Sequence, residues 1–298
     1  MGSLMARMLS QQPGLMPQAE PDTPFVPQWR ATRAEDYSKA WFVDASHKLK
    51  IAPILHRKVW ELVYVLKNIE TAGKLAPGMM GIGFGCGEEP LPSYFAARGA
   101  QILATDVDPQ SQSAQAWIAT AQHATSLDKV FKPDLISRAD FDSKVSFRYV
   151  DMNAIPEDLH GKFDFCWSVC AFEHLGSIRQ GLDFVRESIK LLRPGGIAVH
   201  TTEFNYSQDE ATIDNRPTVL FRKKDFLALK EFLEADGCRV PSVSFDVGNT
   251  LLDYFIDVPP YPWHEGYFHD DLPPLQLKLM VDGFPSTCYG IIVTRPAP

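Results

Sequence analysis

The fold is decided by two short stretches, MGIGFGCGEE at residues 80–89 and ILATD at residues 102–106. They indicate an apolar strand, a glycine-rich turn, a helix, and a second apolar strand that ends on an acidic residue. A β-α-β unit of this kind places bare backbone against a nucleoside-like ligand and a carboxylate against its ribose hydroxyls. The two stretches therefore predict an α/β fold with a nucleoside site.

The spacing of the glycines favours one nucleoside over another. Dinucleotide-binding turns follow G-x-G-x-x-G and face a pyrophosphate with a helix N-terminus. Here Gly83, Gly85 and Gly87 form G-x-G-x-G, and Glu88 and Glu89 follow at the start of the helix. Two carboxylates would repel a pyrophosphate, whereas S-adenosylmethionine (SAM) carries a sulfonium and an ammonium and no phosphate. The pattern favours SAM, with an ordinary tight turn as the alternative.

Composition limits the class of protein. The 298 residues are 45% hydrophobic, enough for one large α/β domain with an attachment. A net charge of −8 argues against a nucleic-acid partner, which would require an excess of Lys and Arg. The five cysteines show neither a zinc pattern nor a disulfide pattern. Without an apolar run of about 18 residues or a secretory start, we expect a reduced cytoplasmic protein with no membrane contact.

The chain divides into three parts. Residues 1–35 are rich in Pro and Gln and are expected to be flexible; residues 36–75 are expected to form a helical cap; and 76–298 alternate strands and helices. Residues 126–142 are polar and expected to be irregular. The expected strands are 79–83, 101–106, 145–150, 163–170, 197–201, 243–245, 277–281 and 287–294, and the expected helices of this part are 91–98, 110–124, 178–192 and 223–235. Such alternation predicts a mostly parallel sheet with helices on both faces.

Five segments in order resemble the class I SAM-dependent methyltransferases, over roughly residues 78–295. They are GIGFGCG at 81–87, ATDVDP at 104–109, VDMNAIP at 150–156, FDFCWSVCAFEHLGS at 163–177 and LLRPGGIAVHTT at 191–202. The resemblance implies a doubly wound, mostly parallel seven-stranded sheet with the last strand antiparallel. One departure is clear: the family usually has an acid two places before the first glycine, and this chain has Gly81 there. Glu88 or Glu89 is the candidate replacement.

The resemblance also implies which residues contact SAM. Glycines of the turn let the cofactor approach the backbone, and a carboxylate after the second strand accepts the ribose hydroxyls. An acid and the following amide after the third strand face the adenine, and the end of the fourth strand contacts the methionine part. The predicted cofactor-binding residues are Gly83, Gly85, Gly87, Asp106, Val107, Asp151, Met152 and Cys170.

Candidates for acid-base catalysis follow the fourth and fifth strands. His174 lies where the family faces its acceptor, and it is the first candidate for a base or an orienting residue. The alternative is that His174 packs beside the cofactor and anchors a helix start. His200 and Glu203 are second candidates. Because side chains alternate along a strand, they should lie on opposite faces of it.

A loop is expected near residues 246–275. Two imidazoles and three carboxylates fall within 264–271, and these are ligand types for a divalent cation. Pro262 and Gly266 interrupt any helical spacing there, so we expect a loop that faces solvent or substrate, and no metal site.

The predicted function is methyl transfer from SAM to a small-molecule acceptor, most plausibly an oxygen of a saccharide or a specialised metabolite. Two alternatives stay open at this point. One is an NAD-linked oxidoreductase on a Rossmann-type fold, and the other is a non-catalytic subunit with a SAM-type fold.

Overall fold

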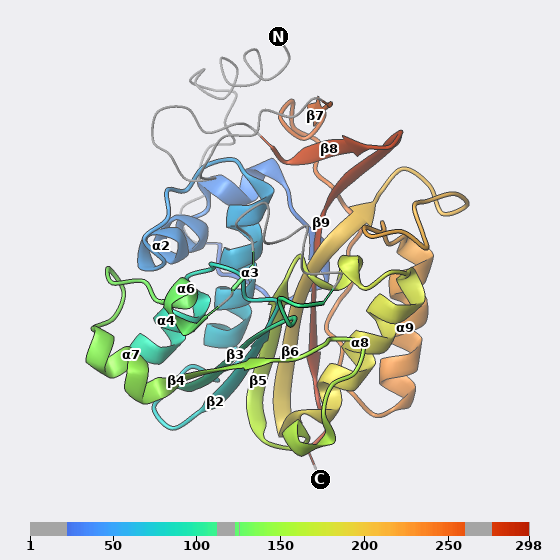
Figure 1. Ribbon diagram of the computed structural model, residues 1–298. Coiled ribbons are helices and arrows are strands. Elements are labelled where there is room, and N and C mark those ends of the chain that lie inside the picture. The colour runs from blue at the N-terminus through green and yellow to red at the C-terminus, as the bar shows by residue number, and fades with distance from the viewer. Residues whose placement is uncertain (1–22, 112–122, 125, 260–275, 298) are drawn as a thin grey trace.

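The computed structural model describes residues 23–111, 123–124, 126–259 and 276–297 (Figure 1). A single mixed sheet runs through the middle of the molecule, and helices cover both of its faces. The strands are β1 Arg30–Ala31, β2 Met80–Phe84, β3 Gln101–Asp106, β4 Val145–Tyr149, β5 Phe163–Val169, β6 Leu192–Asn205, β7 Ile256–Asp257, β8 Lys278–Val281 and β9 Phe284–Thr294.

The order of the strands is β4-β3-β2-β5-β6-β9-β8-β7, and β1 also pairs with β9. Strands β4 to β6 are parallel to one another, whereas β9 is antiparallel to both β6 and β8. This confirms the doubly wound sheet with an antiparallel last strand. The sheet has nine strands rather than the predicted seven, because β1 and β7 also join it. Each of these has only two residues, too few to show a hydrophobic alternation in the sequence.

The helices form a layer on each side of the sheet, with α2, α3, α4, α6 and α7 on one side and α8 and α9 on the other (Figure 1). The α-helices are α2 Ala40–Lys48, α3 Arg57–Thr71, α4 Leu91–Ala97, α6 Leu127–Val130, α7 Arg138–Lys144, α8 Ile178–Lys190 and α9 Lys223–Ala235. Short 3-10 helices are η1 Ala34–Ser38, η2 Glu157–Leu159 and η3 Phe172–His174.

Most of the predicted elements form, with a few differences. β3 and α9 have the bounds that were predicted, and β6 is longer because it pairs with both β5 and β9. The stretch 126–142, expected to be irregular, contains α6 and most of α7, whose start is capped by the Ser137 side chain. The strand expected at 243–245 is a single bridge between Trp29 and Val243. The helix expected at 110–124 and the residues 264–271 lie mainly or wholly outside the described residues.

Residues 29–38 connect the N-terminal helices to the sheet. Trp29 is fully buried and its indole N–H donates to the carbonyl of Ile292 in β9, at 2.7 Å. Asp36 is buried as well, and it accepts from both the Arg30 guanidinium and the Trp60 indole of α3. This part of the segment expected to be flexible is therefore built into the fold. The predicted division into segment, cap and domain stays a prediction.

The sheet topology positions the site. The carboxyl ends of β2, β3, β5 and β6 meet at one edge of the sheet, and the chain order reverses between β2 and β5. In open α/β sheets, ligands bind outside the carboxyl ends of the strands at this reversal. The residues predicted to contact the cofactor lie at or just after the carboxyl ends of β2, β3, β4 and β5.

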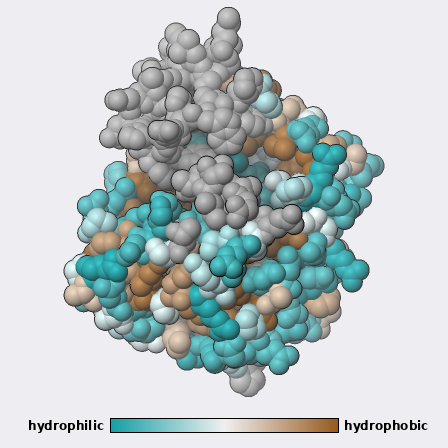
Figure 2. Space-filling view, viewed as in Figure 1, coloured by the Kyte–Doolittle hydropathy of each residue, from teal (hydrophilic) through white to brown (hydrophobic). Residues whose placement is uncertain are grey.

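On the face shown in Figure 2, hydrophilic residues cover much of the described surface, with smaller hydrophobic areas between them. None of the described helices combines the length and the apolar character that crossing a membrane requires.

Close packing of α3 on β9 gives a test of the fold. Gly290 of β9 lies under the ring of Tyr64, and a Cβ at this position would collide with that ring. We expect Gly290→Ala to lower the free energy of unfolding by about 1–3 kcal/mol, because the core cannot take the extra methyl group without displacing the ring. Urea denaturation measures the change.

The control is the same replacement in a Tyr64→Ala background, where the ring is absent. There Gly290→Ala should cost much less. Equal losses in the two backgrounds would show that the ring does not set the packing at Gly290.

Candidate active site

The glycine-rich turn after β2 requires glycine at two positions. Gly85 and Gly87 have φ of 57° and 51°, in the left-handed region that side chains disfavour. The turn is held against β3 by two hydrogen bonds: the amide of Cys86 donates to the Thr105 carbonyl at 3.0 Å, and the Thr105 hydroxyl donates to the Gly83 carbonyl at 2.7 Å. The bare backbone of this turn therefore lies at the carboxyl edge of the sheet.

Asp106 joins this turn to the end of β3. Its carboxylate accepts three backbone N–H groups, from Gly87 at 3.1 Å, Val107 at 2.8 Å and Ala124 at 2.9 Å. The side chain of His123 lies 3.6 Å away. Burial raises the pKa of Asp106, while the amides and His123 act against this shift. A carboxylate has about four acceptor positions, so most of them are already used within the protein.

Asp151 and Met152 follow β4 after one intervening residue, Val150. β4 pairs with β3 so that Tyr149 is opposite Asp106, and the amide of Val150 donates to the Asp106 carbonyl at 2.9 Å. The two predicted adenine-binding residues thus lie beside the predicted ribose-binding residue. Asp151 is exposed, and Met152 is half-buried against the core.

Cys170, just after β5, has an unusual backbone. Its φ of 49° is in the left-handed region, which costs a residue with a Cβ about 1–3 kcal/mol. Its amide donates to the carbonyl and the hydroxyl of Thr201, at 3.0 and 3.1 Å, and these bonds hold the conformation. The strained residue lies at the reversal of strand order, where a ligand is expected.

A group of three buried carboxylates and two partly buried cations, here called the ionic cluster, lies between α3 and the ends of β5 and β6. Its members are Arg57, Lys58, Glu61, Glu173 and Glu203.

The guanidinium of Arg57 contacts Glu203 directly and lies 3.6 Å from Glu61. Glu61 also accepts from the Thr201 hydroxyl at 2.6 Å, and Glu203 accepts from the Ser286 hydroxyl at 2.9 Å. Charges this deep in a protein are stable only when paired in this way.

Unlike Glu61 and Glu203, Glu173 has no Lys or Arg of the described residues within 4.0 Å of its carboxylate. It is fully buried, and its Oε2 accepts from the Thr202 hydroxyl at 3.0 Å. Among the described residues its Oε1 has no hydrogen-bond partner. Burial raises the pKa of Glu173. Burial acts on Glu203 in the same direction, but Arg57 and Lys58 outweigh it and lower the pKa of Glu203.

His174 adjoins Glu173. Its Nε2 lies 3.7 Å from Glu173 Oε1, and its Nδ1 lies 3.1 Å from the Pro217 carbonyl and from the Thr218 hydroxyl. Burial lowers the pKa of His174 to about 4, so the ring is neutral at pH 7. When Nδ1 donates to the Pro217 carbonyl, the lone pair of Nε2 faces Glu173.

Three potential metal ligands also meet here. The sulfur of Cys170 and the carboxylates of Glu173 and Glu203 offer ligand atoms within 4.8 Å of one another. Arg57 already contacts Glu203, and its Nη1 lies 3.7 Å from the Cys170 sulfur. The guanidinium of Arg57 therefore already supplies positive charge beside these three potential ligands.

His200 lies elsewhere. It is fully buried on the α8 side of β6, where its Nδ1 and Nε2 pair with the hydroxyls of Ser168 and Ser188 at 2.8 and 3.0 Å. Glu203 points to the α3 side, so the two residues face opposite sides of β6, as the alternation predicted. The arrangement leaves neither ring nitrogen of His200 for a substrate.

The sequence interpretation omitted the α3 residues of the cluster. Arg57 and Glu61 are separated by one helical turn, a spacing that brings two side chains together. A charged pair on the same helix as Val59, Leu62, Val63 and Leu66 was the available signal.

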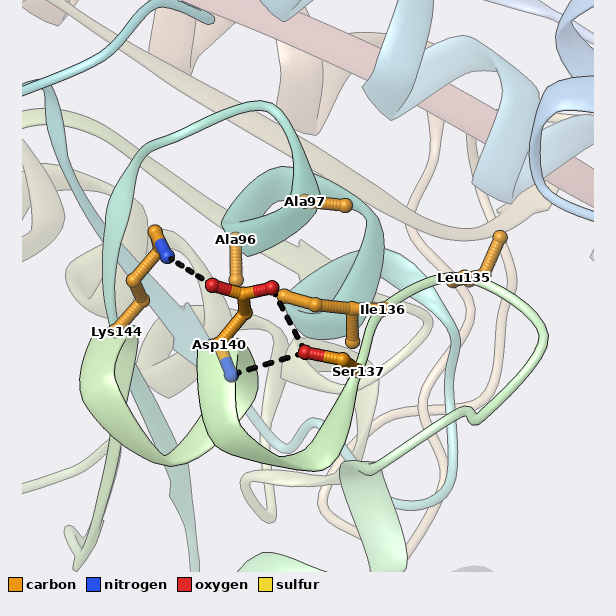
Figure 3. Close-up of a pocket in the computed structure, with 7 residues that line it drawn as sticks. All are labelled: Ala96, Ala97, Leu135, Ile136, Ser137, Asp140 and Lys144. Atoms are coloured by element: carbon orange, nitrogen blue, oxygen red, sulfur yellow. Dashed lines mark hydrogen bonds and ion pairs between the residues drawn. The ribbon is translucent and has the colours of Figure 1, made fainter.

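A pocket of about 320 Å³ lies between α4 and α7 and is lined by Ala96, Ala97, Leu135, Ile136, Ser137, Asp140 and Lys144 (Figure 3). Lys144 directly precedes the start of β4, so this pocket is at the opposite edge of the sheet from the turn and the cluster. It is distinct from the candidate active site.

Comparison with known proteins agrees with this geometry. Residues 82–200 match the family described as a methyltransferase domain. No curated protein matches the chain.

Three solved structures illustrate the similarity. The [4+2]-cyclase SpnF is 16% identical with a TM-score of 0.47, over 80% of this chain and 84% of that one. A SAM-dependent methyltransferase from Mesorhizobium loti is 12% identical with a TM-score of 0.43, over 76% and 96%. Another from Aquifex aeolicus is 15% identical with a TM-score of 0.39, over 77% and 88%.

The fold is that of a class I methyltransferase, with residues 82–200 as its methyltransferase domain. The match identifies residues 82–200 as a methyltransferase domain, in agreement with the predicted SAM-dependent enzyme class and the predicted cofactor. This confirms the predicted family, enzyme class and cofactor, and it favours them over the NAD-linked alternative.

The buried His200 gives a prediction for acid stability. Burial lowers its pKa to about 3, whereas an unfolded histidine titrates near pH 6.5. Below about pH 6.5 the unfolded state therefore binds a proton that the folded state does not. His200 then removes about 1.4 kcal/mol of stability for each pH unit down to about pH 3. His200→Gln should make the loss of stability with acid less steep, as measured by urea denaturation from pH 7 to pH 4.

The same replacement at the exposed His47 is the matched control. An unchanged acid slope in His200→Gln would contradict the structural role of this residue.

Proposed function

We propose that this enzyme transfers the methyl group of SAM to a hydroxyl oxygen of a small molecule, at the ionic cluster. The observation that supports this most strongly is the buried Glu173 Oε1, which has no hydrogen-bond partner among the described residues and lies 3.7 Å from His174 Nε2. A buried polar atom of this kind suits a ligand that brings its own donor. An acceptor hydroxyl is such a donor.

In this proposal SAM lies along the carboxyl edge of the sheet. The turn at Gly83, Gly85 and Gly87 contacts SAM through its main chain. The ribose of SAM binds to Asp106 and Val107. Because three amides already occupy the Asp106 carboxylate, binding both ribose hydroxyls requires one of them to give way. Asp151 and Met152 face the adenine, and Cys170 faces the methionine part.

The reaction is a single displacement. The acceptor oxygen forms a bond to the methyl carbon while the carbon–sulfur bond breaks, and S-adenosylhomocysteine (SAH) leaves. The hydroxyl proton passes to Glu173, with His174 orienting the acceptor. Methyl transfer from a sulfonium needs mainly alignment and exclusion of water, which the buried setting supports. Burial raises the pKa of Glu173, which makes its carboxylate a stronger base than an exposed carboxylate.

His200 has no part in this mechanism, and Glu203 serves as the paired anion that holds Arg57. The described part of the predicted substrate loop, residues 246–259, carries Leu251, Tyr254 and Val258 with large exposed fractions, which would offer apolar contacts to an acceptor such as a saccharide or a specialised metabolite. A cytoplasmic location and the absence of nucleic-acid and membrane partners stay predictions.

The acceptor class is tested by SAH release from purified protein with SAM and two panels of small molecules, one with hydroxyl groups and one with amines. We expect SAH to form with members of the hydroxyl panel, because a neutral hydroxyl is the acceptor that needs a base. Turnover restricted to amines would contradict oxygen transfer.

The role of Glu173 is tested by Glu173→Gln. We expect kcat to fall about 100-fold or more, because the amide cannot take the proton, while SAM affinity changes little. Kinetics and calorimetric SAM titration measure the two quantities. Glu187→Gln on the exposed side of α8 is the control. If Glu173→Gln kept full turnover while His174→Gln lost it, the base would be His174.

A further inference from the structure

The acid that the family usually places before the glycine turn has no room in this protein. Gly81 and Gly83 lie beneath two aromatic side chains of β5, and a Cβ added at either would collide with the ring of Phe165 or of Trp167. The two rings stack on each other, with centroids 5.9 Å apart, and Phe95 of α4 meets both edge-on. Aromatic rings thus occupy the space that an acidic side chain would fill.

A carboxylate nevertheless reaches Trp167, the ring that covers Gly83, from the other end of the turn. The indole N–H of Trp167 donates to Glu89 Oε1 at 2.6 Å, one residue before Pro90 and the start of α4. Glu88 is turned outward and pairs with Lys129 at 2.9 Å. Of the two glutamates that follow the turn, only Glu89 points inward.

Among the described residues, Glu89 receives hydrogen bonds from Trp167 and Cys86 but has no adjacent cation. No basic side chain of the described residues lies within 4.0 Å of its carboxylate. The groups that face it are the thiol of Cys86, the carboxylate of Asp106 and, as the weakest influence, Lys132. Burial raises the pKa of Glu89 to about 8. A buried carboxylate without a cation is stabilised by a ligand that brings one.

We propose that Glu89 binds the ammonium group at the methionine end of SAM, in place of the acid that β2 lacks. The inference rests on the SAM site of the proposed function and adds a residue to it. Asp106 is close enough to Glu89 to raise its pKa, so the ribose and the methionine part would be held by two neighbouring carboxylates. Trp167 fixes the orientation of Glu89 through its indole N–H.

The test compares three ligands by calorimetric titration of the full chain: SAM, SAH and 5′-methylthioadenosine, which lacks the amino-acid part. Glu89→Gln should weaken SAM and SAH about tenfold or more, because a hydrogen bond to a charged group is lost. The affinity of the Glu89→Gln variant for 5′-methylthioadenosine should stay within about twofold of that of the wild type. Glu88→Gln is the matched control and should leave all three unchanged.

A second readout follows from the protonation of Glu89. Binding a cation beside a protonated carboxylate releases its proton, so the wild type should release a proton on binding SAM at pH 7, and Glu89→Gln should not. Titrations in buffers of different ionisation enthalpy measure this.

Equal weakening of all three ligands by Glu89→Gln would mean a structural role and overturn the inference, as would no weakening at all. Failure of the wild type to bind any of the three ligands would contradict the SAM site of the proposed function. Binding by the wild type with no selective effect of Glu89→Gln would contradict only the role of Glu89.

Discussion

The carboxylate of Asp106 is the interaction on which the site depends. It accepts amides from three separate places in the chain: the glycine turn after β2, the residue that follows β3, and the segment at Ala124. Asp106 is only 6% exposed, and its carboxylate, satisfied by backbone donors, fixes the turn relative to the sheet. The left-handed conformation of Gly87 directs its amide to this carboxylate, and glycine adopts it without a steric penalty.

The same edge of the sheet carries a second set of charges with a different purpose. The ionic cluster brings two cations and three carboxylates together under α3, and the carboxylates are not equally paired with the cations. Glu203 takes the guanidinium of Arg57, whereas Glu173 keeps one oxygen without a donor. Environments that push the pKa values of neighbouring carboxylates in opposite directions are typical of acid-base sites. The asymmetry between Glu173 and Glu203 is therefore the main physical argument for where the acceptor binds.

Much of the fold was predictable, because glycine spacing and hydrophobic alternation are local signals. They indicated the turn, β3, β5 and α9 and placed the site at the carboxyl edge. The short strand β1 and the burial of Trp29 could not be predicted, since both arise from pairing with β9, more than 250 residues away in the chain.

The roles of the polar residues were harder to predict than the fold. In the sequence, His200 and Glu203 were equal candidates for a catalytic role. Only the packing of β6 shows that His200 is held by two serines and Glu203 by Arg57. Glu173 precedes the residue chosen as the base. The catalytic role of Glu173 depends on whether a hydrogen-bond donor reaches its Oε1, and this is determined by tertiary contacts. Phe165 and Trp167 explain why glycine replaces an acid in β2, and nothing local in the sequence indicates that they cover it.

The central claim is that Asp106 both organises the turn and receives the ribose of SAM. The most direct measurement is the dissociation constant of SAH for Asp106→Asn, with the exposed Asp108→Asn as the matched control. The account predicts a loss of about 100-fold or more in Asp106→Asn, equivalent to two hydrogen bonds to a charged group, and no change in Asp108→Asn. An SAH affinity in Asp106→Asn equal to that of the wild type would contradict it.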